Sequence, residues 1–326
     1  MKYFLLAKRC LLKGIYCLVI ITLLVFWPVS MFSVTPPFNS NGHYYALWKA
    51  VEIANLKDQR HLNKEALAFY TELPDKLKST TAFYSGWPVA EAFANFFTLG
   101  YACPKFERIQ WDLHSLCGGP ALSRQKCLAE LIQKEMASES IVYWRLGFLL
   151  HAYGDAFAHS YRDDNRFILD PNRCPRQKGM VPNPHFGERY LYRAPLGHAL
   201  EGHAPDLVRS DIALFHTYFT NLVQLLNGGP LSKAQVEQVR NYLVTLDEQL
   251  STSSSAENEI FRSYVPRNTY NPDGAPWTDE LSRKDFERLL LTHPVSFKVE
   301  LPSDSQVDAL NCQIQKASLG CQNLQK

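Results

Sequence analysis

The sequence predicts an all-α protein, with several helices in one domain preceded by a single hydrophobic helix at the N-terminus. Two observations carry this prediction. Apolar residues recur at helical spacing in successive segments, several of which end at proline or glycine. There is no internal repeat and no series of alternating segments that would indicate strands. With 46% hydrophobic residues among 326, the chain can bury a sizeable core.

The first 34 residues have the composition of a membrane-targeting segment. Four basic side chains precede an uncharged run from Gly14 to Val34, which is long enough to cross a bilayer as a helix. Because a basic flank stays in the cytoplasm, we expect everything after Val34 to be exported. The length of the run and the lack of a small-x-small cleavage site favour a signal anchor, and a cleaved signal peptide remains the alternative.

The charge and the cysteines of the remaining chain agree with export. It carries 30 basic and 32 acidic residues, since four of the 34 basic residues lie in the leader, so no general affinity for nucleic acid is expected. Six cysteines lie outside the leader, an even number that favours disulfides in an exported protein. Cys312 and Cys321 are spaced to close a small C-terminal loop, and the other pairings stay open. We expect the non-cytoplasmic side of a bacterial inner membrane, or secretion if the leader is cleaved.

The rest of the chain is divided into a linker, a helical domain and a tail. Residues 35–42 are typical of a linker and turn, residues 43–293 form the predicted helical metal-binding domain, and residues 294–326 form a tail with a short strand and a disulfide loop. Ser232 and Gln235 form a capping box that begins one helix. The predicted helices cover residues 43–56, 62–73, 89–99, 121–136, 139–160, 206–226, 232–250 and 279–291.

A long loop is predicted over residues 162–196. The segment is rich in proline and arginine and poor in aliphatic residues. Long loops inside compact domains often carry function, so this one is a candidate for substrate contacts.

The strongest chemical signal is the spacing of His151, Asp155 and His159. Residues at i, i+4 and i+8 fall within about 80° of one helical face. Their neighbours along the chain are mostly apolar, so the helix is expected to be buried and to present one carboxylate and two imidazoles together. An unpaired buried carboxylate is costly, and a divalent cation removes that cost. The pattern favours a metal site. The alternative is that Asp155 only orients a histidine in a polar core.

A second cluster of ionisable residues follows the long loop. His198 is the better ligand candidate there, with Glu201 and His203 as alternatives. Asp206 follows a proline and opens a predicted helix, so we interpret it first as an N-cap and second as a ligand.

Three motifs together give the chain a resemblance to a known superfamily. They are His43-Tyr44-Tyr45, the Leu-His-x-Tyr-x-Asp-x-x-x-His run over residues 150–159, and the Gly-His…Pro-Asp segment over residues 197–206. In these the chain resembles the zinc-dependent phospholipase C and single-strand nuclease superfamily, and is most similar to an uncharacterised bacterial branch of it. The resemblance covers about residues 43–210.

The resemblance implies an all-α, multi-helix phospholipase C/nuclease-like bundle with long loops that holds one to three zinc ions. Carried over to this sequence, it assigns metal ligands to His43 in the first helix, to the central helix and to His198. It also implies an acid and a histidine between these helices, for which Asp75 and His114 are the candidates. Asp75 is in addition the candidate general base. The superfamily has an acidic ligand four residues after the last histidine, where this chain has Gly202.

These features lead to two hypotheses about function. The first is an exported, metal-dependent hydrolase of phosphoesters, either small molecules or lipids, with Arg162 and Arg166 as candidate contacts for the phosphate. The second is a non-catalytic cell-envelope protein whose metal site is structural or vestigial, which the departure at Gly202 favours. The expected partners are the phosphoester and the membrane, through the N-terminal helix. Nothing in the sequence points to a specific nucleic-acid or protein partner.

Overall fold

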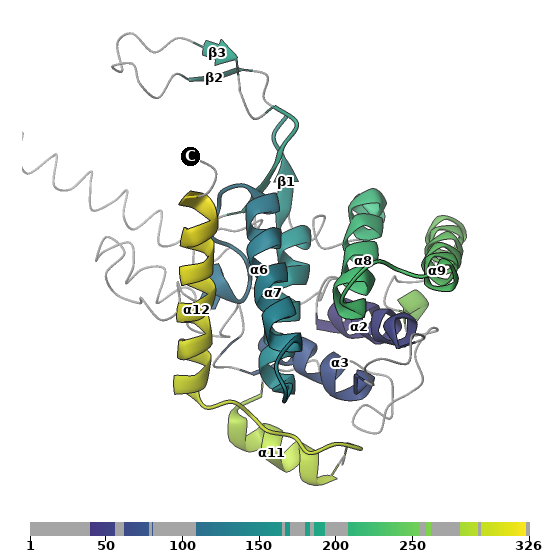
Figure 1. Cartoon of the computed structure of the whole chain (residues 1–326), viewed down its shortest axis with the longest axis vertical. Helices are drawn as coiled ribbons and strands as arrows, with labels where there is room; N and C mark the ends of the chain where they lie inside the picture. Colours follow the sequence, from purple (N-terminus) through teal and green to yellow (C-terminus); the bar gives the residue numbers. More distant parts are fainter. Residues whose placement is uncertain are drawn as a thin grey trace, which may run out of the picture. The chain divides into compact units, whose positions relative to one another are not determined.

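The computed structural model shows a mostly helical protein (Figure 1). The chain divides into two compact units, Met1–Pro36 and Pro37–Lys326. The structure describes residues 40–55, 62–77, 80, 109–164, 167–169, 180–182, 186–192, 208–253, 259–261, 281–292 and 295–323. The predicted leader, linker start and helix at 89–99 therefore lie outside the described residues. Among those that are described, no helix is long and apolar enough to span a membrane.

Three helices surround the centre of the second unit. Helix α2 (Ser40–Ala54) packs against α3 (Lys64–Glu72), and α3 packs against α7 (Tyr143–Ala158). The N-cap Asn63 begins α3 because its side chain accepts a hydrogen bond from the Ala66 amide. A short 3-10 turn, η2 (Leu73–Asp75), follows α3 and brings Asp75 to the side of α7.

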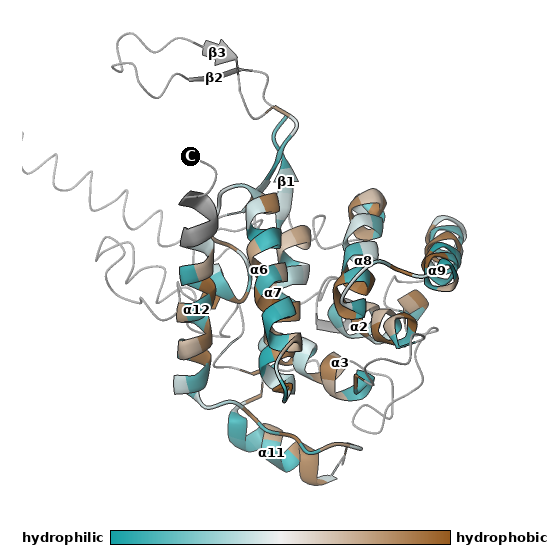
Figure 2. Ribbon diagram, in the orientation of Figure 1, coloured by the Kyte–Doolittle hydropathy of each residue, from teal (hydrophilic) through white to brown (hydrophobic). Residues whose placement is uncertain are grey.

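The remaining helices pack around these three. Helix α6 (Ala121–Met136) lies beside α7, while α8 (Ile212–Asn227) contacts α2, α6 and α7. Helix α9 (Lys233–Thr252) packs on α8 and α2. The predicted capping box is confirmed. The Ser232 side chain accepts a hydrogen bond from the backbone N–H of Gln235, and the Gln235 side chain accepts one from the backbone N–H of Ser232. In Figure 2, hydrophilic and hydrophobic residues alternate around α9, as expected for a helix with one buried face.

The fold differs from the all-α prediction in the region predicted as a long loop. Two small antiparallel sheets form there. Strand β1 (Ser160–Arg162) pairs with β4 (Arg189–Leu191), and β2 (Phe167–Leu169) pairs with β3 (Met180–Pro182). Strands of three residues are too short for their side-chain alternation to stand out in a sequence, which is why no strand was predicted.

Several helix bounds differ from the sequence prediction: α2 begins at Ser40, three residues before its predicted start, and α7 covers Tyr143–Ala158 and not residues 139–160. Helix α8 begins at Ile212 and not near residue 206, because Asp211 is its N-cap and accepts from the Leu214 amide. Helix α11 (Arg283–Thr292) begins after Ser282 and ends one residue beyond the predicted end.

The C-terminal segment is a helix, so the predicted strand and disulfide loop are wrong. Helix α12 (Asp304–Asn323) packs on α6 through Val307, Leu310 and Ile314, which are all buried. Cys312 is a free thiol, and both Cys312 and Cys321 lie in this one helix, nine residues apart, where the helix rise separates their backbones by about 13 Å. No disulfide joins two described side chains, although Cys127 of α6 is itself disulfide-bonded.

Helix α12 contains a buried, unsatisfied polar group, which yields a stability prediction. Asn311 is 1% exposed, and neither polar atom of its amide has a hydrogen-bond partner. An unpaired buried amide costs about 1–3 kcal/mol, so replacement by the isosteric leucine should raise the free energy of unfolding by about 1 kcal/mol. Urea unfolding of Asn311→Leu, with Asn311→Asp as a destabilised control, measures this. A leucine variant less stable than the wild type would contradict it.

Candidate metal centre

The centre of the site is α7, a helix buried on almost every side. Fourteen of its residues are buried, and among them are His151 at 0% and Asp155 at 2% exposure. Because these residues are four apart, they lie on one face of the helix. The helix therefore delivers an imidazole and a carboxylate into the core, where neither can be solvated by bulk water.

Backbone carbonyls fix which nitrogen of each histidine carries the proton. His151 donates from Nδ1 to the carbonyl oxygen of Thr71 at 2.9 Å, and His114 donates from Nε2 to that of Thr80 at 2.8 Å. A carbonyl oxygen can only accept, so these ring nitrogens hold hydrogens. In the neutral rings, the opposite nitrogens are left with unshared lone pairs.

Those lone pairs converge on one carboxylate oxygen. Three atoms form a triangle with sides of 3.2 Å: His151 Nε2, His114 Nδ1 and Asp155 Oδ2. Oδ1 of Asp75 lies 3.7 Å from both of these nitrogens. With neutral rings, no hydrogen stands between the atoms, and four acceptors face one another in a buried space. The arrangement is stable only if it takes up positive charge, either as a proton or as a cation.

The electrostatics of the metal-free cluster point the same way. Burial acts to lower the pKa of His151, but the charges of Asp155 and Asp75, together with hydrogen bonds, outweigh it and raise the pKa to about 9. Burial acts to raise the pKa of Asp155, but the charges of His151 and His159 and the hydrogen bonds from the imidazoles hold it well below its usual range. The site therefore keeps Asp155 ionised and attracts a positive charge to its neighbours.

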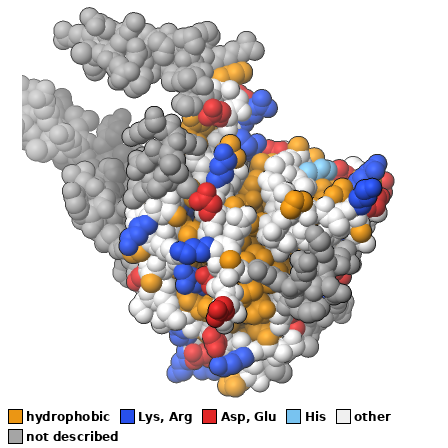
Figure 3. All heavy atoms as spheres, in the orientation of Figure 1, with side chains coloured by type: hydrophobic (Ala, Val, Ile, Leu, Met, Phe, Trp, Pro, Cys, Tyr) orange, Lys and Arg blue, Asp and Glu red, His pale blue; other side chains and the backbone are white. Residues whose placement is uncertain are grey.

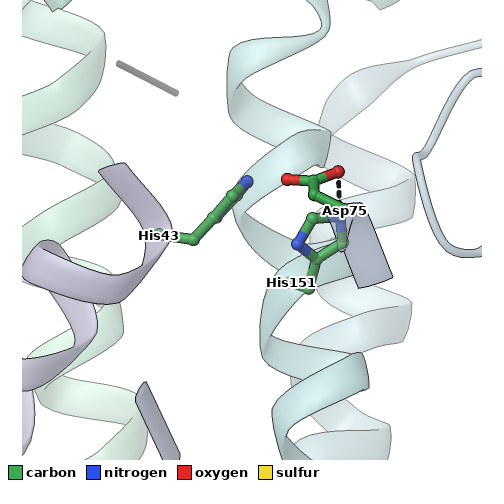
Figure 4. Close-up of side chains that lie close together, drawn as sticks. All are labelled: His43, Asp75 and His151. Atoms are coloured by element: carbon green, nitrogen blue, oxygen red, sulfur yellow. Dashed lines mark ion pairs between the residues drawn. The ribbon is translucent and has the colours of Figure 1, made fainter. Parts of the chain in front are cut away.

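His43 enters the cluster from the other side, carried by α2. Its Nε2 lies 2.8 Å from Oδ1 of Asp155, and its ring centroid is 4.4 Å from that of His151. Figure 4 shows the His43 ring pointing toward Asp75 and His151, which come from η2 and α7. The Nδ1 atom of His43 is buried without a hydrogen-bond partner.

Two overlapping groups of these residues have the spacing of metal ligands. His114, His151 and Asp155 form one, and His43, Asp75 and His151 form the other, each with ligand atoms within 4.8 Å of one another. Four zinc ligands at about 2.0–2.1 Å from the metal lie roughly 3.3–3.4 Å apart. The observed separations of 3.2 and 3.7 Å bracket that value. Each of His114 and His151 also donates its second nitrogen to a carbonyl, as metal-bound histidines do. The residues thus fit a small divalent cation.

The structure brings together five of the residues singled out in the sequence: His43, Asp75, His114, His151 and Asp155. His159 belongs to neither group. His159 is the C-cap of α7: its backbone N–H still donates to the Asp155 carbonyl, as in the helix, while its side-chain Nδ1 donates to the His114 carbonyl at 2.8 Å. The same Nδ1 lies 3.7 Å from Oδ2 of Asp155.

The remaining candidates are not part of the described cluster. The side chain of Arg162 is 62% exposed on β1 and pairs with Asp164 at 3.3 Å. The candidates that lie outside the described residues are Arg166, His198, Glu201, His203 and Asp206.

The backbone groups that orient the histidines could not be recognised from side-chain patterns in the sequence. Thr71 contributes only its carbonyl, and it reaches His151 because α3 lies very close to α7 at Gly147. A Cβ on Gly147 would collide with the Cβ of Tyr70 and lie 2.7 Å from the Tyr70 carbonyl carbon. The available signal was a glycine inside a predicted helix, which costs about 0.5–1 kcal/mol relative to alanine and so indicates close packing.

Comparison with known proteins found no relative of this chain. The chain matches no family model, and no match was found to a curated protein or to a solved structure.

The raised pKa of His151 gives a pH dependence that can be measured in the presence of a chelator. The folded chain holds this proton more tightly than the unfolded chain, so the stabilisation is complete below about pH 6.5. It should be lost as the pH rises through about 9, by up to about 3 kcal/mol. Burial raises the pKa of Glu72 to about 7. Deprotonation of Glu72 is therefore largely complete before the pH reaches the region in which His151 loses its proton.

Chemical denaturation between pH 7 and 10 measures this loss of stability. His151→Gln should flatten the profile, and added zinc should reverse the trend because imidazole binds metal only when deprotonated. A wild-type profile that is flat in chelator would contradict the electrostatic account.

Proposed function

We propose that the chain is a zinc-dependent hydrolase that acts on phosphoesters. The observation that carries the metal is the convergence of His114 Nδ1, His151 Nε2 and Asp155 Oδ2 at 3.2 Å, with no hydrogen to separate them when the rings are neutral. Nitrogen-rich sites with one or two carboxylates suit zinc better than calcium or magnesium, which prefer oxygen ligands.

The exposure of the cluster supports a division of roles among its residues. His43, His114, His151 and Asp155 are at most 2% exposed and would hold the metal. The side chain of Asp75 is 24% exposed, so water can reach it. In this proposal, zinc supplies a bound water with a pKa near 7 and neutralises charge on the substrate. Asp75, whose Oδ1 lies 3.7 Å from two ligand nitrogens, is placed to accept a proton at the edge of the site.

The choice of a phosphoester rests on the sequence resemblance to zinc-dependent phospholipases C and single-strand nucleases. The surface favours a small molecule or lipid over a long polyanion, because Lys and Arg are interspersed with Asp and Glu on the face drawn in Figure 3. The same proposal places the domain outside the bacterial cytoplasm, as the basic leader and its apolar run indicate.

A second function is favoured by one specific observation, the near-complete burial of four of the five cluster residues. A metal enclosed by protein ligands on every side stabilises a fold but does not bind substrate. In this alternative, the chain is a cell-envelope protein with a structural metal.

Removal of the central charge tests the metal site. Asp155→Asn keeps the shape of the side chain but deletes the charge that offsets the cation, so zinc affinity should fall by orders of magnitude. The melting temperature should fall as well, because metal that binds only the folded state stabilises it. Chelator should lower the melting temperature of the wild type and have little effect on the variant. Asp247→Asn, which alters the more exposed pair with His216, is the matched control and should keep its metal.

The contrary result for that experiment is a wild-type chain that contains no metal as purified and melts at the same temperature with and without chelator. Asp155 would then be a core partner of the histidines and nothing more.

Hydrolysis of a generic phosphodiester and of a phosphatidylcholine analogue tests the activity. With zinc added, the wild type should hydrolyse these substrates at least about a hundredfold faster than His151→Ala, because His151 belongs to both ligand groups. His216→Ala, which removes a histidine outside the cluster, should keep full activity. If folded, zinc-loaded wild type shows no more activity than His151→Ala, the hydrolase proposal fails and the structural alternative stands.

A further inference from the structure

Gly154, the residue of α7 just before Asp155, lies directly against the His43 side chain of α2. A Cβ built on Gly154 would lie 2.6 Å from Cε1 and 2.7 Å from Nδ1 of His43. Carbon atoms that are not bonded to each other lie at about 3.5–4.0 Å in good contact, so any side chain at this position must displace the imidazole. The same point is 3.2 Å from the hydroxyl oxygen of Tyr218.

The imidazole of His43 is buried between Asp155 and the ring of His151. It is 1% exposed, its Nε2 is held at 2.8 Å from Asp155, and its ring lies 4.4 Å from the ring of His151. Figure 4 shows it directed toward Asp75 and His151. A shift away from Gly154 would therefore change its distance to the carboxylate that it faces.

Glycine at position 154 lowers the stability of the helix itself. Glycine in a helix interior is about 0.5–1 kcal/mol less favourable than alanine, and Ala152, Ala156 and Ala158 occupy neighbouring positions in α7. Glycine at position 154 is thus explained by the space that His43 requires. The contrast within the chain is Gly229, where a Cβ would meet nothing within 4 Å.

We propose that Gly154 is a positioning residue of the metal centre, which sets the place of His43 as the ligand supplied by α2. This rests on the proposed metal function. Alanine at position 154 pushes His43 off Asp155 and leaves His114, His151 and Asp155 as the remaining group. The loss of zinc affinity in Gly154→Ala then equals that in His43→Ala, on the order of 10–100-fold, and the double variant loses no more than either single one.

The decisive measurement is a double-mutant cycle on the full-length chain with two readouts. Zinc affinity and the visible spectrum of bound Co²⁺ are recorded for the wild type, Gly154→Ala, His43→Ala and the double variant, with Gly229→Ala as the matched control. Thermal unfolding in chelator is recorded for the same five proteins. In chelator, Gly154→Ala lowers the melting temperature by several degrees through overpacking, and the double variant recovers most of that loss because His43→Ala empties the space.

Each outcome bears on the proposal. Equal, non-additive losses of zinc affinity, matching Co²⁺ spectra and recovery of the melting temperature support it. Additive losses, or no recovery in the double variant, overturn it. If His43→Ala binds zinc like the wild type while Asp155→Asn does not, the proposal fails and the metal site survives. If the wild type binds no zinc, the proposed function fails with it. Should Gly154→Ala not fold, a folded double variant still supports the clash and an unfolded one overturns it.

Discussion

The buried carboxylate of Asp155 is the constraint around which the helices are arranged. It is 2% exposed, and an ionised group at such a place needs opposite charge close to it. His43 faces one of its oxygens, while His114 and His151 face the other. These imidazoles come from three separate segments of the chain, so the position of each segment is tied to a single carboxylate. The close approach of the His43 side chain to Gly154 of α7, and of α3 to Gly147, agree with this requirement, because imidazoles reach Asp155 only at short range.

Part of this arrangement could be predicted from the sequence because it depends on local spacing. His151 and Asp155 share a face of α7 through the helical repeat alone, and the capping box at Ser232 is a local pattern as well. The range predicted for helix 121–136 coincides with α6. His43, Asp75 and His114 could be named only through a resemblance, since no spacing relates residues so far apart in the chain.

Other parts depend on backbone contacts that leave no pattern in the sequence, and one part was misinterpreted although a pattern was present. His159 has the spacing predicted for a ligand, but its Nδ1 is hydrogen-bonded to the His114 carbonyl, which no spacing reveals. The C-terminal tail was interpreted as a strand with a disulfide, although Val307, Leu310 and Ile314 have the spacing of an apolar helical stripe. The carbonyls of Thr71 and Thr80 orient two histidines without any side-chain signal.

The imidazole nitrogens and carboxylate oxygens gathered in the core could hold a small divalent cation. X-ray absorption at the zinc edge, recorded on the full-length chain after zinc is added and excess is removed, tests this most directly. The account predicts a first shell of nitrogen and oxygen at about 2.0–2.1 Å with the outer-shell scattering of imidazole. Retention of no zinc, or a first shell dominated by sulfur at about 2.3 Å from cysteine ligands, would contradict it.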